Sequence, residues 1–328
     1  VLIGVHHGLL HTPDADAPGS GGWHGLDIRL VGEQLLVTRV AADSPAAAAG
    51  VQPGWVLQAV AGRSVDGIIE LADRLAGGVT RREVVAAQIV ASRLDGGPGA
   101  TIEATFLGDE DDAPAADGLR TVAIELGTSP DPMYGIGNLP PMPVAIESRT
   151  LEGGIGYFRL GVFMGPDRVM PAWRAFLAAH AEAPGIVLDL RGNPGGLIAM
   201  SGGLLNFLVD ERGLRMGTMH MRDPDRGPFE FPLMINPWAD SYAMSLAVLV
   251  DELSASNSEI LAAAVQDLGR GHIVGGRTAG LVLPSTVELL PNGDGFLHAF
   301  AGYDRSRGDS LEGVGVEPDV AVAPSRTA

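Results

Sequence analysis

A short apolar run that leads through three serines into a helical pattern constrains this chain most. Residues 243–250 (AMSLAVLV) are rich in strand formers and long enough for a buried strand. From Glu259 onward, apolar residues recur at helical spacing. Between the two patterns lie Ser254, Ser256 and Ser258. A strand that turns into a helix at a serine places the hydroxyl beside the free N–H groups of the helix N-terminus, where an anion is favoured.

Two interpretations of these serines remain open on this stretch alone. Serine is a common N-cap residue, so one of them can serve only to cap the helix. Alternatively, one serine is a nucleophile, and the helix N-terminus stabilises the oxyanion that its attack creates. The rest of the chain has to decide between a cap and a catalyst.

Composition narrows the chemistry that a nucleophile can use here. At 328 residues the chain exceeds a typical single domain, so two domains are expected. All 22 basic residues are arginine and lysine is absent, so a general base has to be His, Asp or Glu. The absence of cysteine excludes a thiol nucleophile, thiolate metal ligands and disulfides. The histidines near the start lack a carboxylate at metal-motif spacing, so we expect no metal and no cofactor.

The charge and the hydropathy of the chain exclude two classes of partner. A formal net charge of −18 disfavours binding to nucleic acid and to anionic membranes. No apolar run approaches the roughly 20 residues of a membrane span, so no spanning segment is expected. The chain begins at Val1 without a methionine, and we expect an N-terminal piece, such as a signal peptide, to be missing. Composition leaves the oligomeric state unknown.

Residues 23–126 predict a compact unit of short strands. The segments 25–31 and 34–40 alternate in polarity and flank a two-residue turn. Ser44 begins a short helical pattern that Gly50 ends. Further strands are expected at 56–60 and 119–126, and further helices at 65–75 and 81–93. Residues 127–154 are rich in proline, glycine and methionine and are expected to be a linker.

Residues 155–328 alternate strand and helix patterns. Strands are expected at 155–160, 185–191, 243–250 and 272–275, and helices at 166–181, at 197–208 and from 259. This order predicts a β/α core with parallel strands, whose ligands bind at the carboxyl ends of the strands. A hairpin is expected at 285–300, around the Asn292-Gly293 turn.

The segment 189–196 (DLRGNPGG) leaves one of these strands and enters a helix through glycines. Exposed backbone N–H groups gather in such a loop and can donate to an oxyanion. The alternative is a plain strand–helix turn in which Asp189 and Arg191 form a structural pair.

Four motifs resemble, in order and spacing, those of the C-terminal processing (tail-specific) serine peptidases. They are DLRGNPGG at 189–196, SASNSEILAA at 254–263, VGGRTAG at 274–280 and LEGVGVEPDV at 311–320. The string SPAAAAGVQPGWVL at 44–57 resembles a PDZ domain in the circularly permuted bacterial form, so the resemblance covers nearly the whole chain. It implies a mixed α/β (α+β) fold. The parts would be a remnant of an N-terminal cap segment (1–22), a PDZ-like β-rich domain (23–126), the linker (127–154) and a crotonase-like β/α catalytic core (155–328).

The resemblance implies a serine endopeptidase that cleaves polypeptides near their C-termini through an acyl-enzyme. The family's nucleophile is the serine before the acidic residue, which here is Ser258. Gly195, Gly196 and the N–H of Glu259 would be the oxyanion donors. The Ser–Lys dyad of one branch is excluded, because Leu281 follows the Thr-x-Gly segment and the chain has no lysine.

The other branch, which resembles the catalytic core of tricorn protease, uses a histidine base and a glutamate. Glu312 matches that glutamate and would orient the base. His6 is the best match for the histidine, with Val5 where the pattern has a serine. His11, which a threonine follows, is the second candidate.

The PDZ-like domain would bind an extended peptide by its C-terminal carboxylate. Gly25, Leu26 and Asp27 would form the carboxylate-binding loop; alternatively, the domain only packs against its neighbour. A catalytically inactive protein that binds peptides or small hydrophobic ligands on the same fold is the alternative function, since retinoid-binding repeats resemble this family too. Relatives often work outside the cytoplasm, so the resemblance implies a periplasmic or secreted location, with a cytoplasmic one as the alternative.

Overall fold

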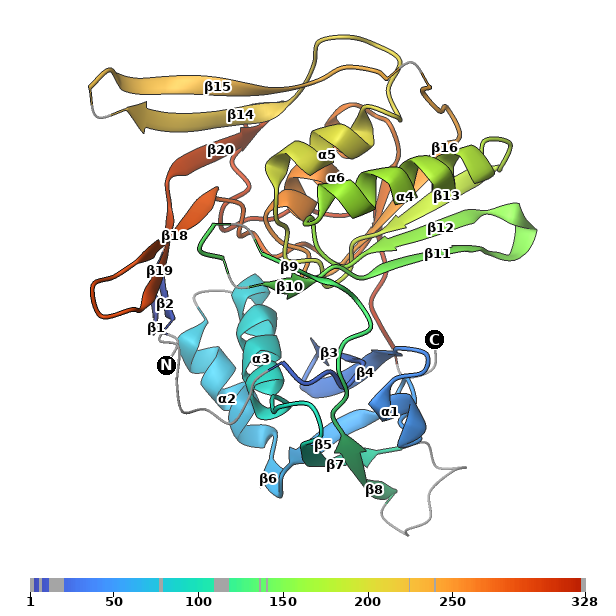
Figure 1. The fold of residues 1–328 in the computed structure, drawn as a ribbon, viewed down its shortest axis with the longest axis vertical. Coiled ribbons are helices and arrows are strands. Elements are labelled where there is room, and N and C mark those ends of the chain that lie inside the picture. The colour runs from blue at the N-terminus through green and yellow to red at the C-terminus, as the bar shows by residue number, and fades with distance from the viewer. Residues whose placement is uncertain are drawn as a thin grey trace. The chain divides into compact units, whose positions relative to one another are not determined.

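A computed structural model describes most of the chain in two compact units (Figure 1). The described residues are 3–5, 8–11, 21–76, 79–108, 118–135, 137–139, 141–223, 225–238 and 240–325, with the side chains of 3–5, 8–11 and 79–81 left aside. Unit 1 comprises residues 1–14 and 131–322, and unit 2 comprises residues 15–130 and 323–328. Unit 2 is therefore inserted into unit 1 along the sequence.

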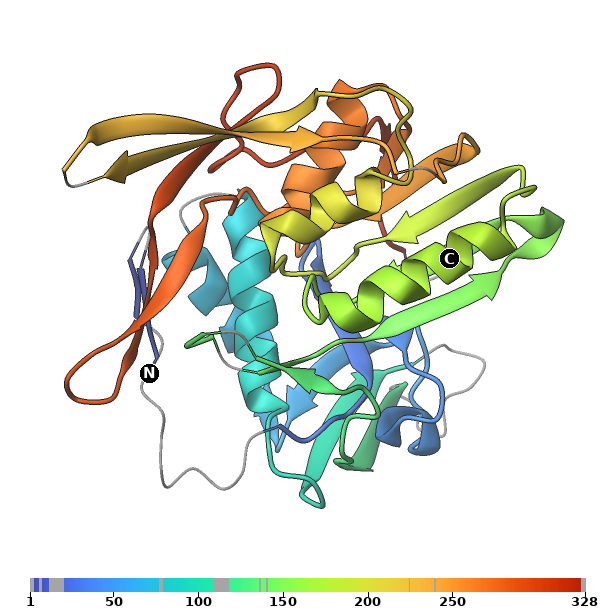
Figure 2. The ribbon, with the colours of Figure 1, turned by 45° about the horizontal axis from the view of Figure 1, so that its top comes forward.

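Unit 1 is built on a six-stranded sheet, and its mixed α/β architecture confirms the predicted fold class. The strand order is β11 (Ile146–Thr150), β12 (Gly156–Leu160), β13 (Gly185–Asp189), β16 (Ser245–Val250), β17 (His272–Gly275) and β21 (Val320–Ala321). Only β11 runs antiparallel to its neighbour. The three connecting helices are α4 (Pro166–Ala179), α5 (Ile198–Leu205) and α6 (Asn257–Asp267), which lie side by side (Figure 2).

The core of unit 1 lies between these helices and the sheet. Trp173 of α4 contacts Phe158 of β12 and Phe176, with ring centroids 5.0 and 5.5 Å apart. Helix α6 is buried throughout residues 257–265. A helix that is apolar on all sides belongs in a core, which explains the uninterrupted apolar pattern after Glu259.

Three smaller sheets complete unit 1. The predicted hairpin is present as β18 (Ser285–Leu289) and β19 (Gly295–Ala299), and β19 also pairs with β2 (Gly8–His11), which pairs with β1 (Ile3–Val5). The second sheet consists of β15 (Gly227–Ile235), β14 (Leu214–Asp223) and β20 (Ala301–Arg305), and the third of β9 (Met133–Tyr134) and β10 (Met142–Pro143). The range expected to be a linker thus contains β9, β10, β11 and a 3-10 turn at Glu152–Gly154.

The described residues of unit 2 form an antiparallel sheet and three helices, and β6 and β7 are strands that the sequence pattern did not predict. The strand order is β3 (Leu26–Val31), β4 (Gln34–Val40), β5 (Val56–Val60), β7 (Thr101–Leu107) and β8 (Leu119–Glu125), and β6 (Arg63–Ser64) pairs with β5. The helices are α1 (Pro45–Ala48), α2 (Asp66–Leu75) and α3 (Val79–Arg93). The Ser44 hydroxyl accepts from the Ala47 N–H at 3.1 Å, which is the predicted N-cap of α1.

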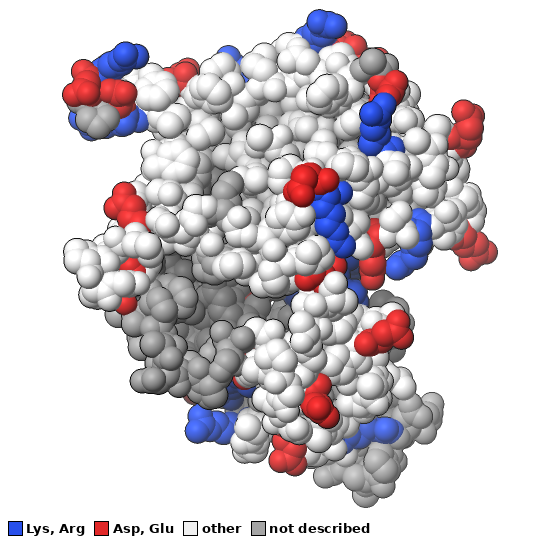
Figure 3. Space-filling model, in the orientation of Figure 1, with Lys and Arg blue, Asp and Glu red and all other residues white. Residues whose placement is uncertain are grey.

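Arginines and carboxylates are interspersed on the face drawn in Figure 3, and no single sign dominates it. None of the described helices combines the length and the apolar character that crossing a bilayer requires. The described residues contain no group of three or more His, Asp or Glu side chains placed to hold a metal ion.

Candidate active site

The turn between β16 and α6 gives its three serines different surroundings. The Ser254 hydroxyl donates to the Leu190 carbonyl at 2.8 Å. Ser258 is 0% exposed, and its hydroxyl donates to the Asn193 carbonyl at 2.9 Å. Ser256 alone of the three is partly exposed. The hydroxyl that an incoming carbonyl can reach therefore belongs to Ser256.

Ser256 also has an uncommon backbone conformation. It precedes the first residue of α6 with φ 54° and ψ −116°. A non-glycine residue in such a region costs about 1–3 kcal/mol, and such strain concentrates at functional sites. A sharp, strained turn from a strand into a helix is the geometry that presents a nucleophilic serine at the edge of an α/β sheet.

The glycine loop after β13 lies directly against this turn. A Cβ atom on Gly195 would be 2.6 Å from the Ser256 Cβ and 2.8 Å from the Asn257 nitrogen. Gly195 has φ 101°, so both its conformation and the close approach require glycine. The loop and the helix N-terminus, which the sequence suggested as two halves of one site, are in contact.

Two of the three N–H groups that the sequence suggested as oxyanion donors already donate hydrogen bonds within the chain. The Gly195 N–H donates to the Asn193 Oδ1 at 2.8 Å, and the Glu259 N–H donates to the Ser256 carbonyl at 2.9 Å. Within the described part of the chain, the N–H groups of Gly196 and Asn257 have no acceptor. These two are the donors that remain available to an oxyanion.

Asn193, which the sequence analysis did not single out, joins the loop to its surroundings. Its Nδ2 donates to the Leu160 carbonyl at 2.8 Å, and its own carbonyl accepts from the Ala255 N–H at 3.0 Å and from Ser258. The side chain is fully buried. An asparagine in a Gly/Pro loop is a common turn residue, so the sequence carries no signal for this role.

The carboxylate of Glu259 is buried and accepts four hydrogen bonds. Its Oε1 accepts from the Thr278 hydroxyl at 2.6 Å and the Gly280 N–H at 2.8 Å. Its Oε2 accepts from the Leu281 N–H at 2.9 Å and the Ser256 N–H at 3.0 Å. Burial raises the pKa of Glu259 to about 7, because these hydrogen bonds offset only part of the desolvation of the charge.

Glu312 binds the continuation of the same segment. Its Oε2 accepts from the N–H groups of Val282 and Leu283, at 2.9 and 3.3 Å. The Gly313 N–H donates to the Gly280 carbonyl at 2.8 Å, so the loop of Glu312 lies along residues 278–283. Residues 278–283 thus lie between the loop of Glu312 and the turn that carries Ser256.

The histidine candidates are placed only in part. His6 lies outside the described residues. His11 ends β2, where its backbone lies opposite Gly295 of β19, and its side chain is not among those described. The strand that ends at His11 joins unit 1 through its pairing with β19.

Asp189 and Arg191 form the structural pair that was the alternative for the glycine loop. The Asp189 carboxylate accepts from the Arg191 Nε at 2.9 Å and from the Tyr157 hydroxyl at 2.7 Å. Burial alone would raise the pKa of Asp189, but the hydrogen bonds and the charge of Arg191 outweigh burial and lower it.

Comparison with known proteins identifies the family. The family model described as "Peptidase family S41" matches residues 154–322, just over half of the chain. The chain belongs to peptidase family S41. This confirms the family that the four sequence motifs indicated.

Two curated relatives carry the name of a processing protease. The carboxyl-terminal-processing protease of Picosynechococcus is 30% identical over 71% of this chain and 51% of the relative. The chloroplastic C-terminal processing peptidase of Tetradesmus obliquus is 33% identical over 55% of this chain and 38% of the relative. The chain thus spans about half or less of the length of these relatives.

Solved structures share the fold over nearly all of this S41 chain. The photosystem II D1 C-terminal processing protease superposes with a TM-score of 0.58 at 25% identity, covering 98% of this chain and 78% of that one. Mature CPAF complexed with lactacystin gives a TM-score of 0.65 at 15% identity, covering 98% and 81%.

In unit 2, polar groups of the loop that was suggested to bind a carboxylate already form hydrogen bonds within the unit. The Leu26 N–H donates to the His24 Nδ1 at 3.0 Å, and the Asp27 carboxylate accepts from the Arg39 Nε at 2.9 Å. Gly25 has φ 81°, and a Cβ there would be 2.2 Å from the Ser44 Cβ. Strand β3, which follows, is at the edge of its sheet.

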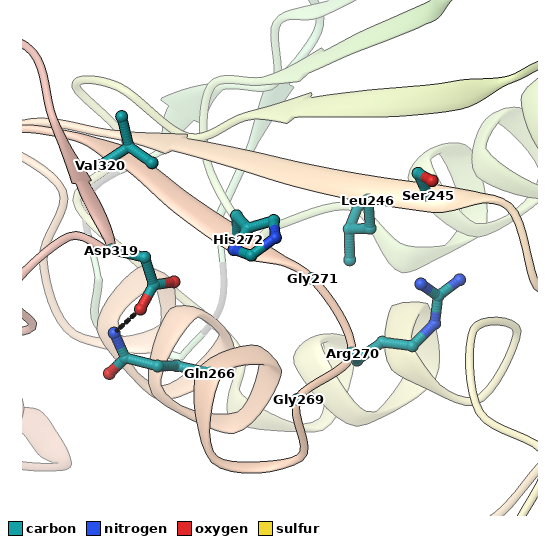
Figure 4. A pocket seen from close by; sticks show the side chains of 9 residues that line it. All are labelled: Ser245, Leu246, Gln266, Gly269, Arg270, Gly271, His272, Asp319 and Val320. Atoms are coloured by element: carbon teal, nitrogen blue, oxygen red, sulfur yellow. Dashed lines mark hydrogen bonds between the residues drawn. The ribbon is translucent and has the colours of Figure 1, made fainter.

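A pocket of about 580 Å³ in this S41 chain holds none of the site residues (Figure 4). It opens at the amino ends of β16 and β17, whereas the serines follow the carboxyl end of β16. Arg270 donates to the carbonyls of Tyr242 and Met244 at 2.9 Å each, so its side chain ties loops together. Asp319 accepts from Gln266 at 2.7 Å.

Proposed function

We propose that this chain is a serine peptidase that cleaves polypeptides near their C-termini, and that Ser256 is its nucleophile. Membership of family S41 and the names of the curated relatives support the activity. One observation carries the assignment: Ser256 is the partly exposed serine on a strained strand-to-helix turn, in contact with the glycine loop.

The geometry disfavours Ser258, which the sequence motif suggested. Ser258 is fully enclosed, and its hydroxyl proton is committed to the Asn193 carbonyl. Attack by Ser258 would require the helix to open around it. Its hydroxyl instead holds the glycine loop against α6.

The proposed reaction follows from the groups around Ser256. A histidine base, His6 or His11, takes the hydroxyl proton as Oγ adds to the scissile carbonyl, and Glu312 orients the imidazole. The N–H groups of Gly196 and Asn257 stabilise the oxyanion. Collapse breaks the C–N bond, the base returns the proton to the leaving amine, and water hydrolyses the acyl-enzyme.

A pair of matched variants tests the nucleophile. A fluorophosphonate probe should label the wild type and Ser258→Ala, and should not label Ser256→Ala. Labelling that survives in Ser256→Ala but is lost in folded Ser258→Ala would return the role to Ser258. A folded wild type that takes up no probe and cleaves no peptide would favour the alternative of an inactive binding protein.

The base is tested in the same assay. His6→Ala and His11→Ala, made separately, should identify one variant that loses both labelling and cleavage while the other retains them. Glu312→Gln should weaken cleavage without preventing folding. If both histidine variants keep wild-type rates, the base assignment fails.

A further inference from the structure

Glu259 is a fully buried ionisable residue beside the nucleophile turn, and the proposed reaction gives it no role. Its four hydrogen bonds come from two segments that approach each other at the site. Ser256 belongs to the nucleophile turn, whereas Thr278, Gly280 and Leu281 belong to the segment after β17. One carboxylate therefore joins the turn to the segment that Glu312 also binds.

Only the ionised form of Glu259 can accept all four bonds. Each donor is a neutral N–H or O–H group, and no arginine is among its hydrogen-bond partners in the described part of the chain. A protonated carboxyl group would direct its own O–H at one of these partners, so it would either displace a backbone N–H or reverse its bond with the Thr278 hydroxyl, and the arrangement of four donors would be lost. The other ionisable groups on the segments packed around it are Asp251, Glu252, Asp267, Arg277 and Glu312.

The bond to Ser256 matters most for chemistry. The Ser256 N–H is shared between the Glu259 Oε2 at 3.0 Å and the Leu281 carbonyl at 2.9 Å. A strained conformation persists only where its surroundings over-determine it, and these two bonds restrain the nitrogen of the strained residue. Loss of the carboxylate would weaken both, because the same carboxylate holds Leu281 in place.

We infer that the ionised carboxylate of Glu259 is a positioning group that holds Ser256 in its reactive conformation, so that protonation of Glu259 switches the site off. This inference rests on the proposed function and adds that pH regulates the activity of the site. The raised pKa of Glu259, about 7, places the switch near neutrality, the range in which an unperturbed imidazole also titrates.

The acidic limb of the pH profile tests the inference. Because the base and Glu259 both have to lose a proton, log kcat/KM of the wild type should rise with a slope approaching about two. In Glu259→Gln the slope should fall to about one, and kcat should fall by roughly 10²-fold with a small change in KM. Glu259→Asp keeps an ionisable group and should retain the steeper limb. An acidic limb of equal slope in the wild type and in Glu259→Gln would overturn the inference.

A milder pair of variants covers the case in which Glu259→Gln does not fold. Thr278→Val removes one donor that stabilises the ionised carboxylate, so the acidic limb should move to higher pH. Thr278→Ser keeps the hydroxyl and should leave the limb in place. A limb that does not move in Thr278→Val contradicts the inference.

The probe separates this inference from the proposed function. Labelling of Ser256 at alkaline pH depends on the proposed function alone. If the wild type is labelled there and the pH profiles do not differ, only the role of Glu259 fails. If the wild type is unlabelled at every pH, the proposed function itself fails.

Discussion

Gly195 leaves no room for a side chain at the candidate site. A methyl group there would lie 2.6 Å from the Ser256 Cβ, and φ 101° disfavours any residue but glycine. The loop can therefore contact the nucleophile turn only because residue 195 has no Cβ atom.

Gly195→Ala should therefore abolish most of the activity while leaving the fold in place. A displaced loop withdraws the Gly196 N–H from the oxyanion, and loss of one such donor costs about 10²–10³ in kcat. Peptide cleavage and thermal unfolding should be measured together. Gly202→Ala, in α5, is the control, because a Cβ there meets only the Ile235 side chain at 3.6 Å. Equal losses in both variants would contradict the proposal.

At this scale the sequence predicted the segment that carries the candidate site, and the resemblance selected Ser258, whereas the geometry favours Ser256. Three serines stand in five consecutive positions, and each is compatible with a strand–helix turn. The choice depends on the first residue of the helix, which is Asn257 and not Glu259 as the apolar spacing suggested. Element ends are the least certain feature of a sequence pattern, and a shift of two residues changes which serine is exposed.

Among the elements, β3 and the turn before it are expected to change their hydrogen bonding with pH. Burial lowers the pKa of His24 from its ordinary value of 6.5, although Asp27 and Asp95 raise it. At neutral pH the ring is therefore uncharged, and its Nδ1 accepts from the Leu26 N–H. Protonation ends that bond, because a charged imidazole has no acceptor.

A peptide with a free C-terminal carboxylate should therefore bind unit 2 more tightly as the pH falls through the lowered pKa of His24. Acidification frees the Leu26 N–H and adds a positive charge beside it. Fluorescence anisotropy of a labelled peptide at pH 7.5 and 5.5 measures the change on the whole chain. His24→Ala should show no such pH dependence. Tighter binding at the higher pH would exclude this loop as the carboxylate site.

Helices and strands were predictable from the sequence where a single apolar periodicity extends over the whole element. Strand β15 was not predicted. The β/α alternation follows from the period of the apolar residues, and the hairpin of β18 and β19 follows from the Asn292-Gly293 turn. Strand β15 contains Pro228 and Pro232, which argue against a central strand. The structure places β15 at the edge of its sheet, where proline is tolerated.

At the scale of the molecule, each unit has a hydrophobic core of its own. In unit 2, Phe106 is fully buried and its ring lies 5.9 Å from that of Trp55. In unit 1, Trp173 has the corresponding position at the centre of the core. Two separate cores predict two unfolding transitions.

Phe106→Ala should destabilise unit 2 by about 3–5 kcal/mol and leave the transition of unit 1 unchanged. Hydrogen exchange, measured at increasing denaturant concentration on peptides from each unit, reports the unfolding of the two units separately. The exchange of the β12 and β13 amides should be the same as in the wild type. A single transition that shifts as a whole would show that the units unfold together.

The insertion of unit 2 separates the parts of the site by most of the chain. Strand β2 pairs with β1 and with β19, and residues 15–130 of unit 2 lie between β2 and β19 in the sequence. During synthesis, β2 is therefore made long before β19, so the part of the candidate site that carries His11 can be completed only after the hairpin of β18 and β19 has been made. Under the proposed function, such a peptidase would not cut while it is being synthesised, so its own unfinished chain and its neighbours would be spared until the hairpin has been made.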